Sequence, residues 1–267
     1  MESINTQLYK LYEPVWKSLT EHCTKLEIEK YQLSVAHPLF IRTDDEYEKA
    51  KFRIMIVGQE TDGWIGDFSS NKNRKSLDFI LNDYYSYLYN NEDKMCKEHY
   101  DDYTPSQRLK KKGQRPFWNQ ANFKFFQDGI QEGLKNDFGD ESISFIWNNV
   151  SKLGKTSRGK ATKDLENIEN TILKGLHKKE LEILKPDVII FTSGSSRDYL
   201  ISERFGGDYS RPTIFTEKEI AKITFSPPYS NILAFRTFHP NARSHVKTRK
   251  SRNKAIVEEV VSYLKKL

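Results

Sequence analysis

The stretch Phe52-Arg53-Ile54-Met55-Ile56-Val57-Gly58 decides the fold class, because it is a short, apolar, β-branched run that ends in glycine. A run of this length and composition is typical of a strand that is buried on both faces of a sheet. Three further runs have the same character, at residues 143–150, 186–191 and 232–238. The sequence therefore predicts four buried strands.

Helical patterns separate these four runs, at residues 119–134, 164–184, 196–205 and 252–267. Alternating strands and helices indicate a parallel sheet that is covered by helices on both faces. We therefore expect an α/β fold, a three-layer α/β/α sandwich with a central, mainly parallel, four-stranded sheet, in which residues 1–267 form a single domain. In such folds, ligands bind beyond the carboxyl ends of the strands.

Two regions do not belong to this alternation. Residues 1–50 carry apolar side chains at helical spacing from Leu8 to Leu19, which predicts an N-terminal helical extension. Residues 66–115 are rich in Tyr, Asn, Asp and Lys, and we expect them to form an insertion over the site, helical through residues 77–89. The tyrosines of that helix either form a lid over a ligand or pack inward from a surface helix.

The composition indicates a folded protein with a strongly hydrated surface. Of the 267 residues, 30% are charged, and aromatic residues reach 13%, which is far more than a disordered chain contains. No apolar run approaches the roughly 18 residues of a membrane span, and the N-terminal residues lack the pattern of a signal peptide. We therefore expect a cytoplasmic protein without a membrane partner.

The cysteines and histidines give no sign of a metal centre. Cys23 and Cys96 form no CxxC motif, which predicts two free thiols, and the six histidines show no spacing of zinc ligands. Gly154-Lys155-Thr156 looks like the end of a phosphate-binding GxxxxGK[ST] loop, but Asn149 stands where that motif needs its first glycine. Neither a metal nor another cofactor is expected.

Basic residues cluster in three places, and their distribution predicts a polyanionic partner. Residues 241–267 hold eight basic residues against two glutamates, so this segment alone accounts for the net charge of +6. Two further clusters lie at residues 108–115 and 152–163. A single cluster is as well explained by a solvated surface, whereas three favour nucleic acid. The expected partner is DNA, and the terminal cluster offers the contacts Arg243, Lys247, Arg249, Lys250 and Arg252.

Polar residues follow the ends of the predicted strands. These segments are Gly58-Gln59-Glu60-Thr61-Asp62-Gly63-Trp64, Asn148-Asn149, Thr192-Ser193-Gly194 and His239-Pro240-Asn241. A carboxylate, an amide and an imidazole at one sheet edge have the composition of an acid–base site. Each also has a structural alternative: Glu60 can cap a helix, Asn148 can satisfy backbone groups, and His239 can be a hydrogen-bonded loop residue.

These segments resemble the motifs of the uracil-DNA glycosylase superfamily. Gly58-Gln59-Glu60-Thr61-Asp62 is similar to the GQDPY motif, and His239-Pro240-Asn241-Ala242-Arg243-Ser244 is similar to HPSPLS. Ile146-Trp147-Asn148-Asn149-Val150 resembles the strand LLLNTV, which carries the base-recognising Asn of the family. The resemblance covers residues 51–267 apart from the insertion. The iron–sulfur branches of the superfamily are excluded, because two cysteines cannot supply four ligands.

The resemblance implies a monofunctional and monomeric DNA glycosylase, which flips a nucleotide and hydrolyses its N-glycosidic bond. Glu60 would activate the water, with Asp62 as a rival, and His239 would donate a hydrogen bond to the departing base. Arg243 would fill the gap left by the flipped nucleotide, and Ser244 would contact a phosphate. The residues expected to bind the substrate are Gly58, Gln59, Asn148, Trp64 and Ser193.

One departure from the family pattern bears on the substrate. Asp62 stands where uracil-specific members have the tyrosine that closes the pocket around C5, and Gly63 follows it. We therefore expect a 5-substituted pyrimidine, such as a base of phage-modified DNA in a defence role, rather than plain uracil. The alternatives are a non-catalytic DNA-binding module, a classical uracil-DNA glycosylase of base-excision repair, and a hydrolase of free nucleosides or nucleotides.

Overall fold

The computed structural model describes residues 2–28, 35–61, 64–89, 123–139, 142–156, 163–210, 216, 219–239 and 246–267. The chain divides into two compact units. Unit 1 consists of Met1–Asp44, Glu60–Gly113 and Ser151–Ile183, and unit 2 of Asp45–Gln59, Gln114–Val150 and Leu184–Leu267. The predictions for Asp62, Gly63, Cys96, Arg243 and Ser244, and for residues 90–115 of the insertion, lie outside the described residues.

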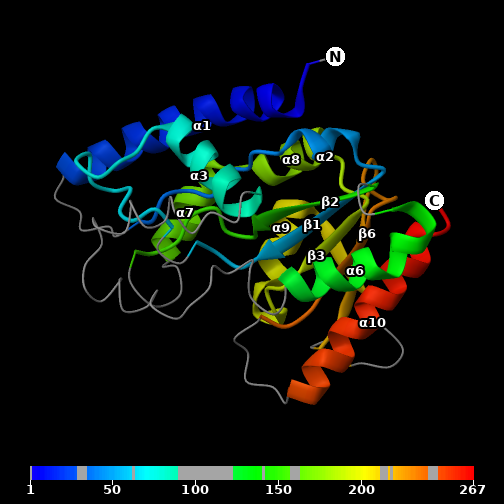
Figure 1. The fold of residues 1–267 in the computed structure, drawn as a ribbon. Helices are drawn as coiled ribbons and strands as arrows, with labels where there is room; N and C mark the ends of the chain where they lie inside the picture. The colour runs from blue at the N-terminus through cyan, green and yellow to red at the C-terminus, as the bar shows by residue number, and fades with distance from the viewer. Residues whose placement is uncertain are drawn as a thin grey trace. The chain divides into compact units, whose positions relative to one another are not determined.

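Unit 2 contains a mixed sheet of six strands, where the sequence predicted four (Figure 1). The strands are β1 (Phe52–Gly58), β2 (Ile143–Asn149), β3 (Val188–Phe191), β4 (Gly207–Ser210), β5 (Ala221–Phe225) and β6 (Leu233–Arg236). Their order is β2-β1-β3-β6-β5-β4. The first four strands in this order, β2, β1, β3 and β6, pair in parallel, and β5 runs antiparallel to both β6 and β4.

The prediction of a four-stranded sheet is therefore wrong by two strands. β4, with the sequence Gly-Asp-Tyr-Ser, has no apolar run, because it lies at the edge of the sheet. β5 alternates buried and exposed residues over only five positions, the pattern of an antiparallel strand with one solvated face. Neither strand resembles the continuously apolar runs of the four parallel strands.

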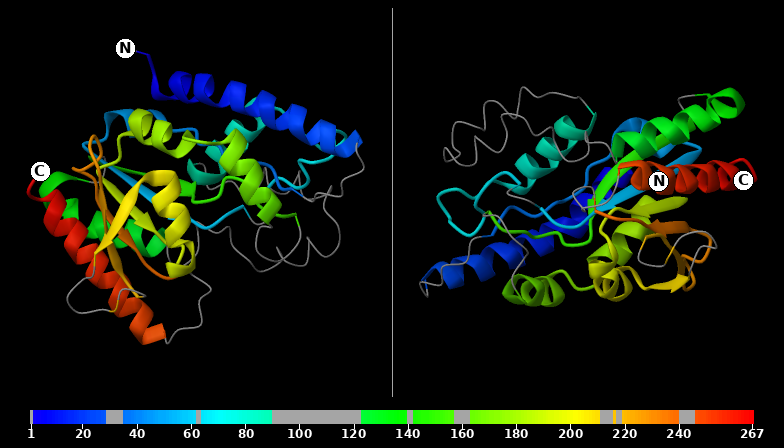
Figure 2. Two further views of the ribbon diagram at one scale, coloured as in Figure 1. Left: turned by 180° about the vertical axis from the view of Figure 1, so that it is seen from behind. Right: turned by 90° about the horizontal axis from the view of Figure 1, so that it is seen from below.

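Helices cover both faces of this sheet, which agrees with an α/β sandwich. Phe191 and Arg236 are register partners and share a face, and they contact Phe205 and Asp198 of α9 (Asp198–Phe205). On the other face lie α6 (Phe123–Phe138) and α10 (Val246–Leu264), side by side in the views of Figures 1 and 2. Unit 2 also holds α2 (Asp45–Lys49) and the short 3₁₀ helix η4 (Ser195–Arg197), which leads into α9.

Glycines allow α6 and α10 to approach closely. A Cβ atom built on Gly133 of α6 would lie 2.6 Å from Cγ2 of Val261 on α10, closer than carbon atoms pack. A Cβ on Gly129 would lie 3.1 Å from Val257. α10 also begins six residues before its predicted start at residue 252, because its basic first turns carry no apolar periodicity.

Unit 1 is built from helices. Its described helices are α1 (Ile4–Ile28), α3 (Leu77–Tyr89), α7 (Lys163–Ile172) and α8 (Leu176–Leu184), whose last residue counts with unit 2. The prediction of a helix through residues 77–89 is confirmed by α3. The single helix predicted over 164–184 is two helices, because Gly175 takes a φ of 77°, a conformation that ends α-helices. Among the described residues, no helix is both long and apolar enough to cross a membrane.

The N-terminal helix is a packed part of unit 1. Leu8, Tyr12 and Leu19 of α1 are at most 1% exposed. The helical extension was predicted over residues 1–50, whereas residues 35–44 are described without helix. α1 therefore supplies part of the core of its unit, which the description as an extension had not anticipated.

Candidate active site at the sheet edge

Direct hydrogen bonds tie together the carboxyl ends of β1, β3 and β6 within unit 2. The Gln59 side chain, just after β1, donates through Nε2 to the carbonyl of Ser193, 2.6 Å away. The Gly194 N–H donates to the carbonyl of Thr237 at 2.9 Å, and the Thr237 N–H donates to the carbonyl of Phe191 at 2.8 Å. Of the predicted site residues, the structure therefore brings Gln59, Ser193 and the segment that leads into His239 to one edge.

Gly194 is the residue that allows this close approach. Its φ of 72° lies in the left-handed region, which side chains rarely adopt. A Cβ atom at this position would lie 3.5 Å from the backbone nitrogen of His239. The turn after β3 thus passes directly beside the His239 backbone, and the His239 residue itself is half-buried.

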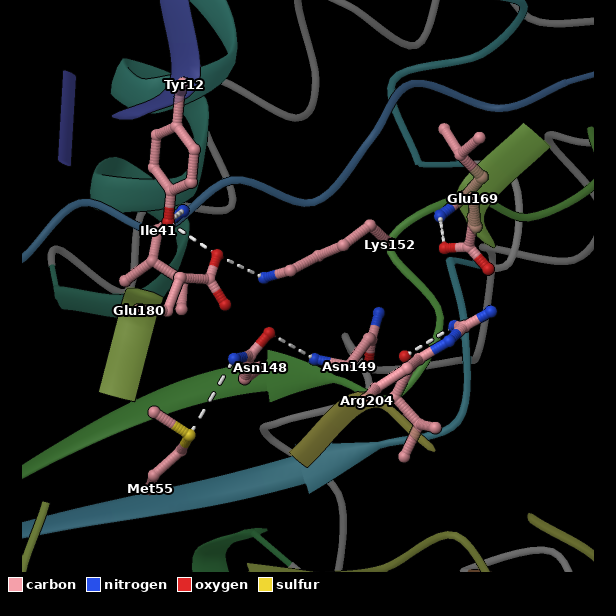
Figure 3. A network of polar contacts seen from close by, with 11 residues as sticks. Tyr12, Ile41, Met55, Asn148, Asn149, Lys152, Glu169, Glu180 and Arg204 are labelled. Carbon is pink, nitrogen blue, oxygen red and sulfur yellow. Dashed lines mark hydrogen bonds and ion pairs between the residues drawn. The ribbon is translucent and has the colours of Figure 1, made fainter. Parts of the chain in front are cut away.

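Asn148 lies on the neighbouring strand, at the same end of the sheet. The register pairs it with Val57, and it pairs Asn149 with Gly58. Asn148 is fully buried; its Oδ1 accepts a hydrogen bond from the Asn149 N–H at 2.8 Å, and its Nδ2 lies 3.7 Å from the sulfur of Met55 (Figure 3). This contact with the backbone is the structural role that was considered for Asn148. The thioether is only a weak acceptor, and recognition of a base by the amide stays a prediction.

Two buried arginines of α9 and β6, which the sequence analysis missed, hold this edge in place. Arg236 at the end of β6 is fully buried and forms a bidentate pair with Asp198, with both N–O distances at 3.0 Å. Arg204 donates to the carbonyl of Val150, where the chain leaves β2, at 2.7 Å (Figure 3). An arginine inside the apolar run Leu-Ala-Phe-Arg is the signal that could have revealed Arg236, because a buried charge needs a partner.

The basic residues of α10 differ in how accessible they are. Lys250 is exposed, as a phosphate contact requires, whereas the side chains of Lys247 and Arg249 lie outside the described part of the helix. Arg252 is only 2% exposed, and its guanidinium carbon lies 4.5 Å from the ring centroid of Phe238. Its Nη1 lies 3.4 Å from Glu219 Oε1. In this structure the charge of Arg252 is therefore buried and paired, unlike that of Lys250, and its contact with DNA stays a prediction.

In unit 1, the residues that follow Gln59 in the chain are also fixed. Glu60 is half-buried, and Thr61 is 3% exposed. A Cβ atom on Gly154 would clash with the carbonyl oxygen of Thr61, so the backbone of residue 61 rests directly on that glycine. Gly154 in turn accepts a hydrogen bond from the Ala36 N–H at 2.8 Å. The Gly154-Lys155-Thr156 segment thus supports the loop after Glu60.

His37 anchors the loop around Trp64, also within unit 1. The His37 N–H lies 3.2 Å from the Trp64 carbonyl; its Nδ1 lies 3.2 Å from the Gly66 carbonyl, and its Nε2 accepts from the Lys75 N–H at 3.0 Å. An accepting Nε2 means that the ring is neutral, with its proton on Nδ1. Burial is the largest cause that lowers the pKa of His37 to about 4; the Gly66 hydrogen bond opposes this shift, and the nearby charges of Lys75 and Arg74 add to it.

The tyrosines of α3 differ in burial and in their contacts. Tyr84 is fully buried and packs inward. Tyr87 is half-buried, and its ring meets that of Trp64 edge-on, with centroids 5.7 Å apart. The helix of the insertion therefore supports the predicted substrate-binding residue Trp64 with an aromatic contact. Whether it closes over a ligand stays a prediction.

A second buried network lies in unit 1, at Lys152. The Lys152 Nζ lies 2.7 Å from Glu180 Oε1, and both side chains are fully buried. The Tyr12 hydroxyl donates to the same oxygen at 2.7 Å and accepts from the Ile41 N–H at 3.2 Å (Figure 3). Burial lowers the pKa of Lys152, and the Glu180 carboxylate opposes that shift. Lys152 was expected in a basic cluster for a polyanion; its charge is instead sealed inside the unit.

Among the described residues, no three His, Cys, Asp or Glu side chains are grouped so that they could hold a metal ion. No protein-family model and no curated protein matches the chain. An amide, a serine hydroxyl and an imidazole-bearing segment at one sheet edge, with a carboxylate next in the chain, can bind a polar ligand and transfer protons.

Proposed function

We propose that the protein is a DNA glycosylase that hydrolyses the N-glycosidic bond of a modified pyrimidine nucleotide. The observation that carries this proposal is the hydrogen-bonded joining of the strand ends at Gln59, Ser193–Gly194 and Thr237. It supports the view that Gln59 and the segment at His239 meet at one edge of the sheet, with Glu60 next to Gln59 in the chain. Such an edge is where α/β sheets bind ligands.

Each residue has a role in a balanced reaction. The bond between the sugar C1′ and the base nitrogen breaks, and the base takes the electron pair. His239 donates a hydrogen bond to the base oxygen on which negative charge develops. Glu60 accepts a proton from a water molecule, whose oxygen bonds to C1′, and the departed base is finally protonated. The buried Ser193 hydroxyl has no hydrogen-bond partner among the described residues, which supports a role in binding the flipped base.

The catalytic roles predict a large loss of activity. Glu60→Gln and His239→Ala should each slow base release by about 10²–10⁴-fold, the usual contribution of a positioned acid or base. The measurement is the formation of alkali-labile abasic sites in oligonucleotides that carry different pyrimidines. Glu203→Gln, the same change at an exposed residue of α9, is the matched control and should leave the rate unchanged.

Other outcomes would change the proposal in defined ways. If Glu60→Gln stays active while Asp62→Asn is inactive, the water-activating carboxylate is Asp62. If the wild-type protein binds DNA but releases no base from any substrate, the protein is a binding module and the catalytic proposal fails.

The choice of substrate follows from the sequence at Asp62-Gly63. A short carboxylate followed by glycine leaves room beside C5 of the pyrimidine, and a carboxylate accepts hydrogen bonds from hydroxyl or amino groups on a substituent. We expect faster excision of a 5-substituted pyrimidine than of uracil, and Asp62→Tyr should remove the preference. Competition between matched oligonucleotides measures it, and a wild-type preference for uracil over every 5-substituted base would refute it.

A further inference from the structure

Arg252 and Asn253 of α10 hold the two residues that precede His239, within unit 2. The Arg252 guanidinium lies over the ring of Phe238 at 4.5 Å, and it is paired with Glu219 at 3.4 Å. Asn253 is 3% exposed, and its Oδ1 lies 3.4 Å from the hydroxyl oxygen of Thr237. Consecutive residues of one helix therefore contact consecutive residues of the segment that ends at His239.

The backbone of Thr237 is fixed from the opposite direction by β3. Its N–H donates to Phe191 and its carbonyl accepts from Gly194. Thr237 is thus held by hydrogen bonds from the sheet and by its contact with α10. Phe238 is held by the charge of Arg252 on the π face of its ring. This cation–π interaction strengthens when water is excluded. His239 is the first residue beyond these contacts.

We propose that Arg252 is a positioning residue, which sets the place and the mobility of the His239 imidazole through the ring of Phe238. Because the guanidinium is planar, it can lie over the ring and reach Glu219 at the same time, which a lysine ammonium cannot do as well. The catalytic consequence rests on the proposed function, since His239 is assigned there as the donor to the departing base. The structural part does not depend on it.

The test uses the full-length protein without substrate. The ring resonances of His239 are assigned in ¹H–¹³C spectra by comparison with His239→Ala, and they are followed during a pH titration. Arg252→Met should shift the His239 resonances and their titration midpoint, and Arg252→Lys should do so less. Lys254→Met removes a charge from the exposed face of the same helix and should leave them unchanged. Identical His239 spectra in folded Arg252→Met and wild type would overturn the proposal.

A second variant keeps the test decisive if Arg252→Met does not fold. Phe238→Leu removes the ring through which Arg252 acts and keeps an apolar side chain, and it should also shift the His239 resonances; unchanged resonances would again overturn the proposal. On a substrate that the wild type cleaves, Arg252→Met should lower kcat by roughly 10- to 100-fold, as expected for a misplaced catalytic group, with DNA affinity retained. If the wild type cleaves nothing, the proposed function fails, and the spectra still decide the positioning role.

Discussion

Each unit of the molecule contains a buried ion pair, and the two pairs differ in how far water reaches them. In unit 1, Lys152 and Glu180 are both fully buried. In unit 2, Arg236 is fully buried, but the side chain of Asp198 is 25% exposed. The sealed pair uses a lysine, which can lose its proton, whereas the pair open to water uses an arginine, which cannot. The cation that can become neutral therefore lies where water is excluded, and the cation that stays charged lies where water reaches its partner.

The largest expected effect comes from breaking the sealed pair. Glu180→Gln removes the carboxylate that is hydrogen-bonded to the buried Lys152 ammonium and leaves only the weaker attraction of Glu169. Breaking such a buried pair typically costs about 3–5 kcal/mol of unfolding free energy. Deprotonation of Lys152 sets an upper limit to this cost. Removing the proton from a lysine with the ordinary pKa of ~10.4 requires about 4–5 kcal/mol at pH 7. The cost should therefore shrink as the pH rises toward 10. Urea denaturation at pH 7 and pH 9.5 measures both effects.

The double variant Lys152→Met/Glu180→Leu is the control for that prediction. It removes both charges of the pair and should recover much of the stability lost in Glu180→Gln, because the buried ammonium that lost its partner is gone. A loss below about 1 kcal/mol in Glu180→Gln would mean that water reaches this pair after all, and the contrast with unit 2 would disappear.

His37 is a further buried titratable side chain, and unlike the two ion pairs it is held in its neutral form. Its folded pKa of about 4 lies below the unfolded value, ~6.5, so the unfolded chain binds more protons between these values. The contribution of His37 to the free energy of unfolding is therefore fully present above pH ~6.5. It is lost as the pH falls to about 4, a decrease of about 3 kcal/mol at ~1.4 kcal/mol per pKa unit. Lys75 and Arg74 act in the same direction as burial.

Urea denaturation of wild type and His37→Gln at pH 7 and pH 4 isolates this contribution, since the carboxylates titrate in both proteins. The variant should be less stable than wild type at pH 7, and that gap should close by about 3 kcal/mol at pH 4. His22→Gln, the same change at a half-buried position on α1, is the matched control for the substitution itself. If wild type and His37→Gln lose the same free energy of unfolding between pH 7 and pH 4, the His37 ring is not held neutral.

The smallest effect is expected for the pair that is open to water. Asp198→Asn keeps an oxygen that can accept a hydrogen bond from Arg236, and water can reach the exposed side of residue 198. We expect a loss of about 2 kcal/mol, typical of a hydrogen bond to a charged group. Unlike Glu180→Gln, its cost should be the same at pH 7 and pH 9.5, because arginine stays protonated. A cost that falls with rising pH would contradict this account.

The sequence predicts best what depends on continuous apolar runs. The four parallel strands follow from such runs, because nearly every residue of each strand is buried. The residues that hold the site edge were not predicted in the same way. Lys152 and Arg252 resemble surface bases in sequence, and only the folded chain shows that Glu180 and Glu219 are their partners. Partners that lie far apart in sequence leave no local pattern.

The interleaving of the two units has a consequence for synthesis on the ribosome. Unit 1 needs Met1–Asp44 as well as Ser151–Ile183, so Tyr12 emerges long before Glu180, its hydrogen-bond partner. At roughly 5–20 residues per second, the nascent α1 helix waits on the order of ten seconds or more for that partner. During this time its apolar face is exposed to chaperones and to other chains. We expect truncated chains that end before Glu180 to bind chaperones and to be cleaved readily by proteases.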